Sequence, residues 1–258
     1  MRAQIRQLAE PFSERDWPTL TCPTCGEGAL NVGKFTYEDH TTEESPDPYD
    51  GDPTAPQGRF HGHLICNRSR CGAWVAVSGT YKTDYELTIR GGEDYLDLWA
   101  NVSVRTLLPA PLIIELTSTV PEPVVTEIRR ASALVWLDPQ AAVGALRSAV
   151  ERVMDDHGIP KRKPTGGRID LHARLETFEQ TMPDTGALLM ATKWVGNSGV
   201  HDPSLISVAE ALNTAEIIET ALRDLYPMDD SEIRTRAAQI NLDKGLRREP
   251  PSNGTSDS

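Results

Sequence analysis

The sequence predicts an α+β protein in which a small β-rich module is followed by an all-α antiparallel helical bundle. Up to about residue 118, short segments rich in Val, Phe, Tyr and Trp alternate between apolar and polar residues, which is the period of a half-buried strand. From Pro121 onwards, apolar residues instead recur every three or four positions, as on one face of a helix. We therefore expect a β-rich module over residues 1–118, a helical bundle over 119–228, and a weak helix with a disordered tail over 229–258.

Length and composition are those of a globular protein with a substantial core. The chain has 258 residues, of which 38% are hydrophobic and 25% are charged. No apolar run approaches the roughly 18 residues of a membrane-spanning helix, and the N-terminus has no apolar signal core. These features predict a cytoplasmic protein without a membrane partner.

The net charge of −12 argues against non-specific binding to duplex nucleic acid, because such binding depends on neutralising phosphates. The acidity is uneven, however. Seven acidic residues lie within 38–52, a segment without Lys or Arg, so the remainder of the chain has a net charge of −5. A local basic patch is compatible with this distribution.

In the first half of the chain, a short amphipathic helix is expected near Ile5 and Leu8. The segment 38–58 contains acids, four prolines and two glycines, and is expected to be a solvated loop. Strand-like segments flank this loop and follow it, at residues 29–37, 59–65, 73–81, 85–90, 102–108 and 112–116.

The first three bundle helices are predicted from their apolar stripes and caps. The first covers 124–135. Asp138 precedes Pro139 as an N-cap and opens the second helix, which ends near Gly158. The third has its stripe over 171–182.

Two longer helices and a weaker one complete the bundle. Asp184 caps the fourth, in which the residues expected to face inward are Leu188, Ala191, Thr192 and Val195. The fifth extends from about residue 204 to 226, and a weaker helix covers 230–243.

The four cysteines form two close pairs, Cys22 with Cys25 and Cys66 with Cys71. Each pair is placed at a turn, because a glycine follows its second cysteine. Paired cysteines at short spacing in a cytosolic chain indicate metal binding rather than disulfides. Four thiolates leave no open coordination position, so we expect a structural Zn²⁺ and a zinc-ribbon module.

Other interpretations of the cysteines remain open. The two pairs could form disulfides, or the four residues could be unrelated buried thiols. His61 or His63, which precede Cys66 on an expected strand, could replace a cysteine as ligand, although exposed strand histidines are the simpler interpretation.

Basic residues occur in two places that could contact nucleic acid. Arg68 and Arg70 lie between the cysteines of the second pair, and a basic loop follows the second bundle helix. The candidate residues for contacting a phosphate backbone are Arg68, Arg70, Lys161, Arg162, Lys163 and Arg168. The alternative is that both are ordinary solvated loops.

A third feature is the stretch from Lys193 to Pro203. Lys193, Asn197 and His201 are four residues apart, so on a helix they lie within roughly 80° of one face. Pro203 would end that helix. Arg147 and Glu151, four apart on an earlier helix, could be neighbours of this face or could form an ordinary surface ion pair.

The segments Arg147-Ser-Ala-Val-Glu151 and Lys193-Trp-Val-Gly-Asn197-Ser-Gly-Val-His201, together with Pro121 and Leu137-Asp-Pro, resemble the family called domain of unknown function 4145 over about residues 118–226. Members of that family often carry an N-terminal zinc-ribbon-like segment. The family has been grouped with the HEPN helical bundles, many of which are metal-independent ribonucleases in bacterial defence. The resemblance thus implies a HEPN-like bundle and a homodimer.

The resemblance also suggests roles for the stretch. RNA cleavage without a metal needs a general acid or base and a cation that stabilises the phosphorane. His201 is the candidate acid or base, Lys193 or Arg147 the candidate cation, and Asn197 the residue that orients His201 or holds the phosphate. The alternative is that Asn197 and His201 cap a helix junction.

Three functions therefore remain open, and whether the protein is an enzyme is undecided. The first is a nucleic-acid-associated or protein-interaction module with a structural zinc, acting in bacterial defence or stress response with an RNA or protein partner. The second is a metal-independent endoribonuclease that uses His201. The third is a purely structural interaction scaffold.

Overall fold

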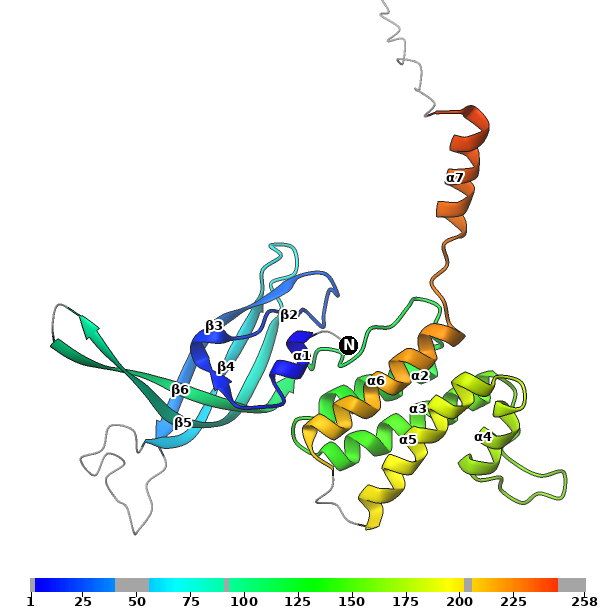
Figure 1. Cartoon of the computed structure of the whole chain (residues 1–258), viewed down its shortest axis with the longest axis horizontal. Coiled ribbons are helices and arrows are strands. Elements are labelled where there is room, and N and C mark those ends of the chain that lie inside the picture. The colour runs from blue at the N-terminus through cyan, green and yellow to red at the C-terminus, as the bar shows by residue number, and fades with distance from the viewer. Residues whose placement is uncertain (1–2, 40–55, 91–92, 202–205, 246–258) are drawn as a thin grey trace, which may run out of the picture.

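A computed structural model describes residues 3–39, 56–90, 93–201 and 206–245, without the side chains of residues 90 and 197–201. Over these residues the chain has the expected α+β architecture, with an antiparallel sheet beside a helical bundle (Figure 1). The last strand ends at Leu108 and the first bundle helix begins at Glu122. No helix in the described ranges is long and apolar enough to cross a membrane.

The first half of the chain forms one curled antiparallel sheet. A short helix α1 and a 3₁₀ turn (Glu14–Asp16) accompany strands in the order β1-β6-β5-β4-β3-β2. Phe60, Leu64 and Val75 are buried on the inner face, as their alternation in sequence predicts. The elements are α1 (Ala3–Gln7), β1 (Phe12–Ser13), β2 (Leu20–Thr21), β3 (Ala29–Asp39), β4 (Gln57–Cys66), β5 (Trp74–Arg90) and β6 (Glu93–Leu108).

Two strand predictions and one loop prediction in this half need correction. The segments 73–81 and 85–90 form the single strand β5, because β6 pairs with it from Ala76 to Arg90 without interruption by a turn. The expected loop 38–58 is shorter, since β3 continues to Asp39 and β4 begins at Gln57, while residues 40–55 lie outside the described ranges. The segment 112–116 is not a strand. Its adjacent isoleucines are both buried, which an alternating strand does not permit.

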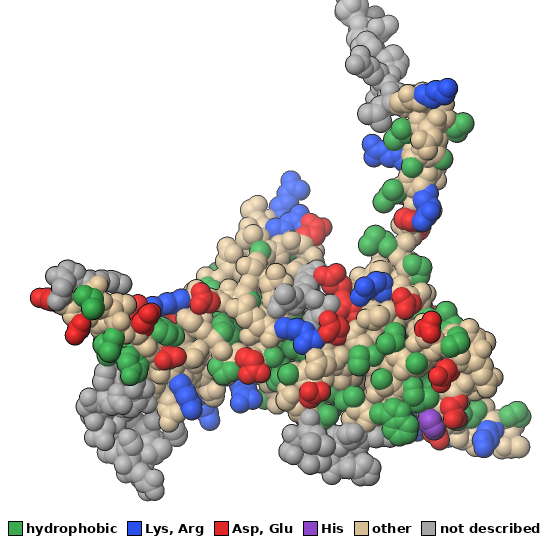
Figure 2. Space-filling view, in the orientation of Figure 1, with side chains coloured by type: hydrophobic (Ala, Val, Ile, Leu, Met, Phe, Trp, Pro, Cys, Tyr) green, Lys and Arg blue, Asp and Glu red, His purple; other side chains and the backbone are tan. Residues whose placement is uncertain are grey.

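The second half of the described chain is an antiparallel bundle. Helix α3 lies at its centre and packs against α2, α5 and α6. Helix α7 has no buried residue and projects from the bundle, with hydrophobic side chains on its surface (Figure 2). The helices are α2 (Glu122–Leu134), α3 (Pro139–Asp156), α4 (Leu171–Glu179), α5 (Pro183–His201), α6 (Val208–Leu225) and α7 (Ser231–Asp243).

The predicted N-cap of α3 is confirmed, whereas the predicted N-cap of α5 is wrong. Asp138 is the N-cap of α3, and its carboxylate accepts the Ala141 N–H at 2.9 Å. Asp184 does not cap α5, because the helix begins one residue earlier, at Pro183, and Asp184 lies in its first turn. Helix α6 begins at Val208 rather than near residue 204, with Ser207 as its N-cap.

The inward face of α5 is also rotated from the expected one. Thr192 is buried as expected, but Leu188, Ala191 and Val195 are only half-buried. The other buried side chains of this helix include Thr185, Leu189 and Lys193. Apolar residues lie on all sides of this helix, so their spacing does not select a face. The rotation places Lys193 in the packed interior instead of on an open surface.

The hydroxyl group of Ser132 binds the segment that connects β6 to α2. Ser132 is fully buried on α2, and its Oγ accepts the N–H of Ile113 at 3.2 Å while donating to the Ile128 carbonyl at 2.8 Å. Both isoleucines are buried as well. This bond therefore satisfies a connecting backbone N–H that water cannot reach.

We expect Ser132→Ala to lower the free energy of unfolding by about 2 kcal/mol, because it leaves the buried Ile113 N–H without an acceptor. Ser148→Ala is the matched control, since the Ser148 hydroxyl donates only to the Gly144 carbonyl of its own helix. Urea denaturation of both variants measures the difference. Equal stabilities would contradict the role of Ser132.

Candidate metal centre and basic pocket

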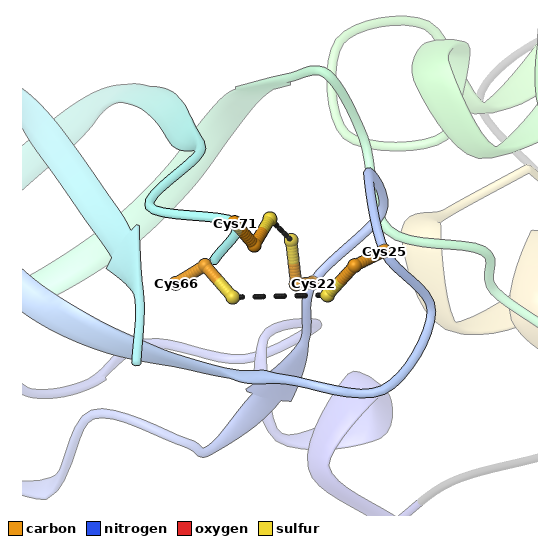
Figure 3. A group of neighbouring side chains, drawn as sticks. All are labelled: Cys22, Cys25, Cys66 and Cys71. Atoms are coloured by element: carbon orange, nitrogen blue, oxygen red, sulfur yellow. Dashed lines mark hydrogen bonds between the residues drawn. The ribbon is translucent and has the colours of Figure 1, made fainter. Parts of the chain in front are cut away.

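Four thiols converge at one end of the sheet (Figure 3). Cys22 and Cys25 lie after β2, Cys66 ends β4, and Cys71 precedes β5. Their sulfur atoms all lie within 4.8 Å of one another. Two of the Sγ–Sγ distances are 3.9 Å, for Cys22 and Cys71, and 3.8 Å, for Cys25 and Cys66. Four sulfurs bound tetrahedrally at about 2.3 Å from a zinc ion would be about 3.8 Å apart, so the group is compatible with a metal site.

Two glycines shape the turns that carry these thiols. Gly26 and Gly72 have φ angles of 70° and 56°, a left-handed conformation that glycine adopts without steric strain. The N–H of Gly26 donates to the Cys22 carbonyl at 2.9 Å, and that of Gly72 donates to the Arg68 carbonyl at 3.0 Å. The resulting bends bring the two thiols of each pair to the same side.

Gly28 is a further part of the cluster that spacing alone did not identify. A Cβ at this position would collide with the sulfur of Cys66. The Gly28 N–H donates to the sulfur of Cys25 at 3.3 Å. This hydrogen bond favours the thiolate and lowers the pKa of Cys25 to about 7. Gly28 therefore leaves room for one sulfur and polarises another.

The histidines of β4 lie outside the thiol cluster. Neither His61 nor His63 belongs to the group of potential ligands found in the described part of the chain. His63 instead stacks on Trp74, with ring centroids 4.1 Å apart and planes inclined by 5°. Trp74 is 62% exposed on the outer face of the sheet. Trp74 lies three residues after Cys71, but no pattern in the sequence marks it as part of a site.

The arginines of the second cysteine turn are at the surface. Arg68 and Arg70 are both exposed, and Arg68 forms an ion pair with Glu27 of the other turn. A surface ion pair of this kind contributes little to stability. The pair does place the Arg68 guanidinium beside the thiol cluster.

The basic loop after α3 is an ordered hairpin over residues 161–169, referred to below as the basic hairpin. The Ile169 N–H donates to the Lys161 carbonyl at 2.9 Å, and Gly166 makes the turn with a φ of 91°. Arg162 and Arg168 form an antiparallel bridge pair. Residues opposite each other in such a pair have side chains on the same face. The hairpin thus presents two arginines together, whereas Lys163 is offset by one residue.

These arginines border a cavity of about 290 Å³, the basic pocket, between the hairpin, α3 and α4. Its lining is mainly cationic. The residues that form it are Glu151, Arg152, Lys161, Arg162, Arg168, Ile169, Leu171 and Arg174.

Asp155 holds three cations of the pocket wall together. Its carboxylate oxygens lie 2.7 Å from Lys161 Nζ, 2.7 Å from Arg174 Nη2 and 3.0 Å from Arg152 Nη1. Partial burial alone would raise the pKa of Asp155, but the hydrogen bonds from Lys161 and Arg174 outweigh it and lower this pKa. Asp155 therefore stays ionised and compensates the buried Arg174.

The expected catalytic stretch from Lys193 to His201 lies on α5, but the structure describes only part of its side chains. Helix α5 includes positions 193, 197 and 201, as predicted, but the side chains of Asn197 and His201 lie outside the described ones. Lys193 is 8% exposed, and its Nζ lies 3.3 Å from the centroid of the Trp194 ring. Such a cation–π contact holds the ammonium on the ring face.

The two neighbours expected on α3 differ in their contacts. A Cβ added to Gly196 would lie 3.9 Å from Cδ of Arg147, so Arg147 does face α5. Glu151 instead faces the basic hairpin, with Oε2 4.0 Å from Arg168 Nη2. Because the side chains of Asn197 and His201 lie outside the described ones, the grouping of Glu151 with these α5 residues stays a prediction.

We expect Asp155→Asn to destabilise the protein by about 2 kcal/mol at pH 7, because Arg174 loses its counter-charge. The folded-state pKa of Asp155 is lowered, so its stabilisation is present above the unfolded-state pKa of about 3.9 and is lost as pH falls through the folded-state value. The difference between wild type and variant, measured by denaturation from pH 7 to 3, should shrink below pH 4. Asp230→Asn, which removes an exposed pair with Arg234, is the control. A difference that stays constant down to pH 3 would contradict this account.

Comparison with known proteins gives two matches, both to families without an assigned function. Residues 129–243 match a family described as Domain of unknown function (DUF4145), and residues 10–107 match one described as Domain of unknown function (DUF8608). No curated protein and no solved structure matches the chain. The first match supports the family resemblance of the helical half, and the second covers the sheet with its four thiols.

Proposed function

We propose that the protein is a nucleic-acid-associated interaction module whose sheet is stabilised by a structural zinc ion. The closed set of four sulfurs supports the zinc, because it leaves no coordination position for a substrate. The resemblance of the helical half supports a role in bacterial defence or stress response, as a homodimer.

The observation that carries nucleic-acid association is the basic pocket. Five cations line it, and two of them, Arg162 and Arg168, are presented on one face of an ordered hairpin. Arginine binds phosphate oxygens through a planar fork of N–H donors. The pocket therefore concentrates positive charge on a chain that has a net charge of −12.

The environment of Lys193 favours nucleic-acid binding over the alternative function, a metal-independent ribonuclease. Lys193, one of the two candidate cations of such a site beside Arg147, is buried against Trp194. A lysine ammonium also lacks the bidentate fork of arginine. RNA cleavage that persists with chelator and disappears in His201→Ala would instead establish the ribonuclease. Absence of both cleavage and RNA binding would leave the interaction scaffold.

We expect the protein to bind single-stranded RNA with an affinity that falls as salt rises. In the Arg162→Ala/Arg168→Ala double variant, the slope of log K against log salt should become shallower by about 1–2, because about two phosphate contacts are lost. Fluorescence anisotropy with a labelled oligonucleotide measures this slope. Arg234→Ala, which removes an exposed arginine on α7, should leave it unchanged. An unchanged slope in the double variant would exclude the hairpin as the contact surface.

For the metal site, we expect Gly28→Ala to weaken zinc binding by about 10- to 100-fold, because the added methyl group displaces the Cys66 sulfur. Competition with a chromophoric chelator measures the affinity. Gly144→Ala is the control, since a Cβ at that helical position meets open space. Equal zinc affinities of the two variants would argue against coordination by Cys66.

A further inference from the structure

Arg174 gives the basic pocket a cationic side chain that is almost completely removed from water. It belongs to α4, is 3% exposed and lines the cavity. Its Nη2 donates to Asp155 Oδ1 at 2.7 Å and to the Ile159 carbonyl at 2.8 Å. Its Nε is buried and has no hydrogen-bond partner among the described residues. A buried guanidinium N–H without an acceptor is costly, and it belongs to a residue that lines the pocket.

The charges around this space do not cancel. Five cations line the pocket, and within the described part of the chain two carboxylates contact them, those of Glu151 and Asp155, which leaves an excess of three positive charges. Asp155 is already shared by three of the cations. Among the residues that the structure describes, Arg162 lies 3.3 Å from the Gly166 carbonyl and Arg168 lies 4.0 Å from Glu151, and both contacts are weaker than those of Asp155. Their guanidinium groups remain available to an incoming anion.

The size of the pocket restricts the ligand. A cavity of about 290 Å³ is at the lower end of ligand sites, which span roughly 300–1,000 Å³. It suits one phosphate group with an adjoining sugar rather than a length of strand. A terminal phosphate has a charge of about −1.5 to −2 at pH 7 and three free oxygens. An internal phosphodiester has a single charge, and the chain continues on both sides of it.

From these observations we propose that the basic pocket binds the terminal phosphomonoester of an RNA strand, with Arg162 and Arg168 at its entrance and Arg174 in its wall. This inference rests on the proposed nucleic-acid association and assigns that association to strand ends.

The test compares four RNA oligonucleotides by fluorescence anisotropy with the full chain. Three share one sequence and have hydroxyl ends, a 5′ phosphate or a 3′ phosphate, and the fourth has hydroxyl ends and one extra nucleotide, which adds a charge as a diester. We expect one of the two phosphorylated oligonucleotides to bind about tenfold more tightly than the two that have hydroxyl ends. The preference should disappear in Arg162→Ala and Arg168→Ala and persist in Arg234→Ala.

Arg174→Lys retains the buried charge but lacks the second arm of the fork, so it should reduce the preference without abolishing general RNA binding. If this variant does not fold, the two hairpin variants decide the outcome. RNA binding without any preference for a phosphorylated end would overturn the inference and leave the proposed function intact. Binding of neither RNA nor inorganic phosphate to the wild-type protein would overturn both.

Discussion

The convergence of four thiols is the constraint on which the geometry of the first half of the chain depends. Cys22 and Cys25 precede β3, while Cys66 and Cys71 flank the turn between β4 and β5. Without a metal, four thiols within 4.8 Å of one another cannot all ionise, because neighbouring thiolates repel, so most of them stay protonated. A divalent cation would favour the four thiolates and join three neighbouring strands at one point. Metal binding and folding of the sheet are therefore expected to be coupled.

In the helical half, the carboxylate of Asp155 brings several like-charged side chains together. Arg152, Lys161 and Arg174 all form ion pairs with Asp155, whose negative charge offsets their mutual repulsion. The compensation is incomplete, since the basic hairpin adds Arg162 and Arg168 on the same side. The pocket is thus a folded element with retained positive charge, which is the property that an anion-binding surface requires.

Local patterns in the sequence were sufficient to predict most of the strands and helices. Alternation identified β3 and β4, and the cap at Asp138 identified the start of α3. Spacing of the cysteines predicted the thiol cluster, because two short turns restrict where paired thiols can point. The segment 112–116 was misassigned, because apolar content alone cannot separate a strand from a buried connection.

The candidate sites were less predictable because they depend on contacts between distant segments. The orientation of Lys193 could not be read from α5, whose apolar residues surround the helix. Arg174 had a visible signal, since it lies within the apolar stripe of Leu171, Leu175 and Phe178, where a charged residue must find a buried partner. Its partner Asp155 and the stacking of His63 on Trp74 require the tertiary fold.

The most direct measurement of the central claim is X-ray absorption spectroscopy, combined with elemental analysis, on protein purified without added metal. We expect one zinc ion per chain with four sulfur neighbours at about 2.3 Å. A folded protein without metal, or a zinc ion with nitrogen or oxygen ligands, would contradict the assignment of Cys22, Cys25, Cys66 and Cys71 as a closed structural site.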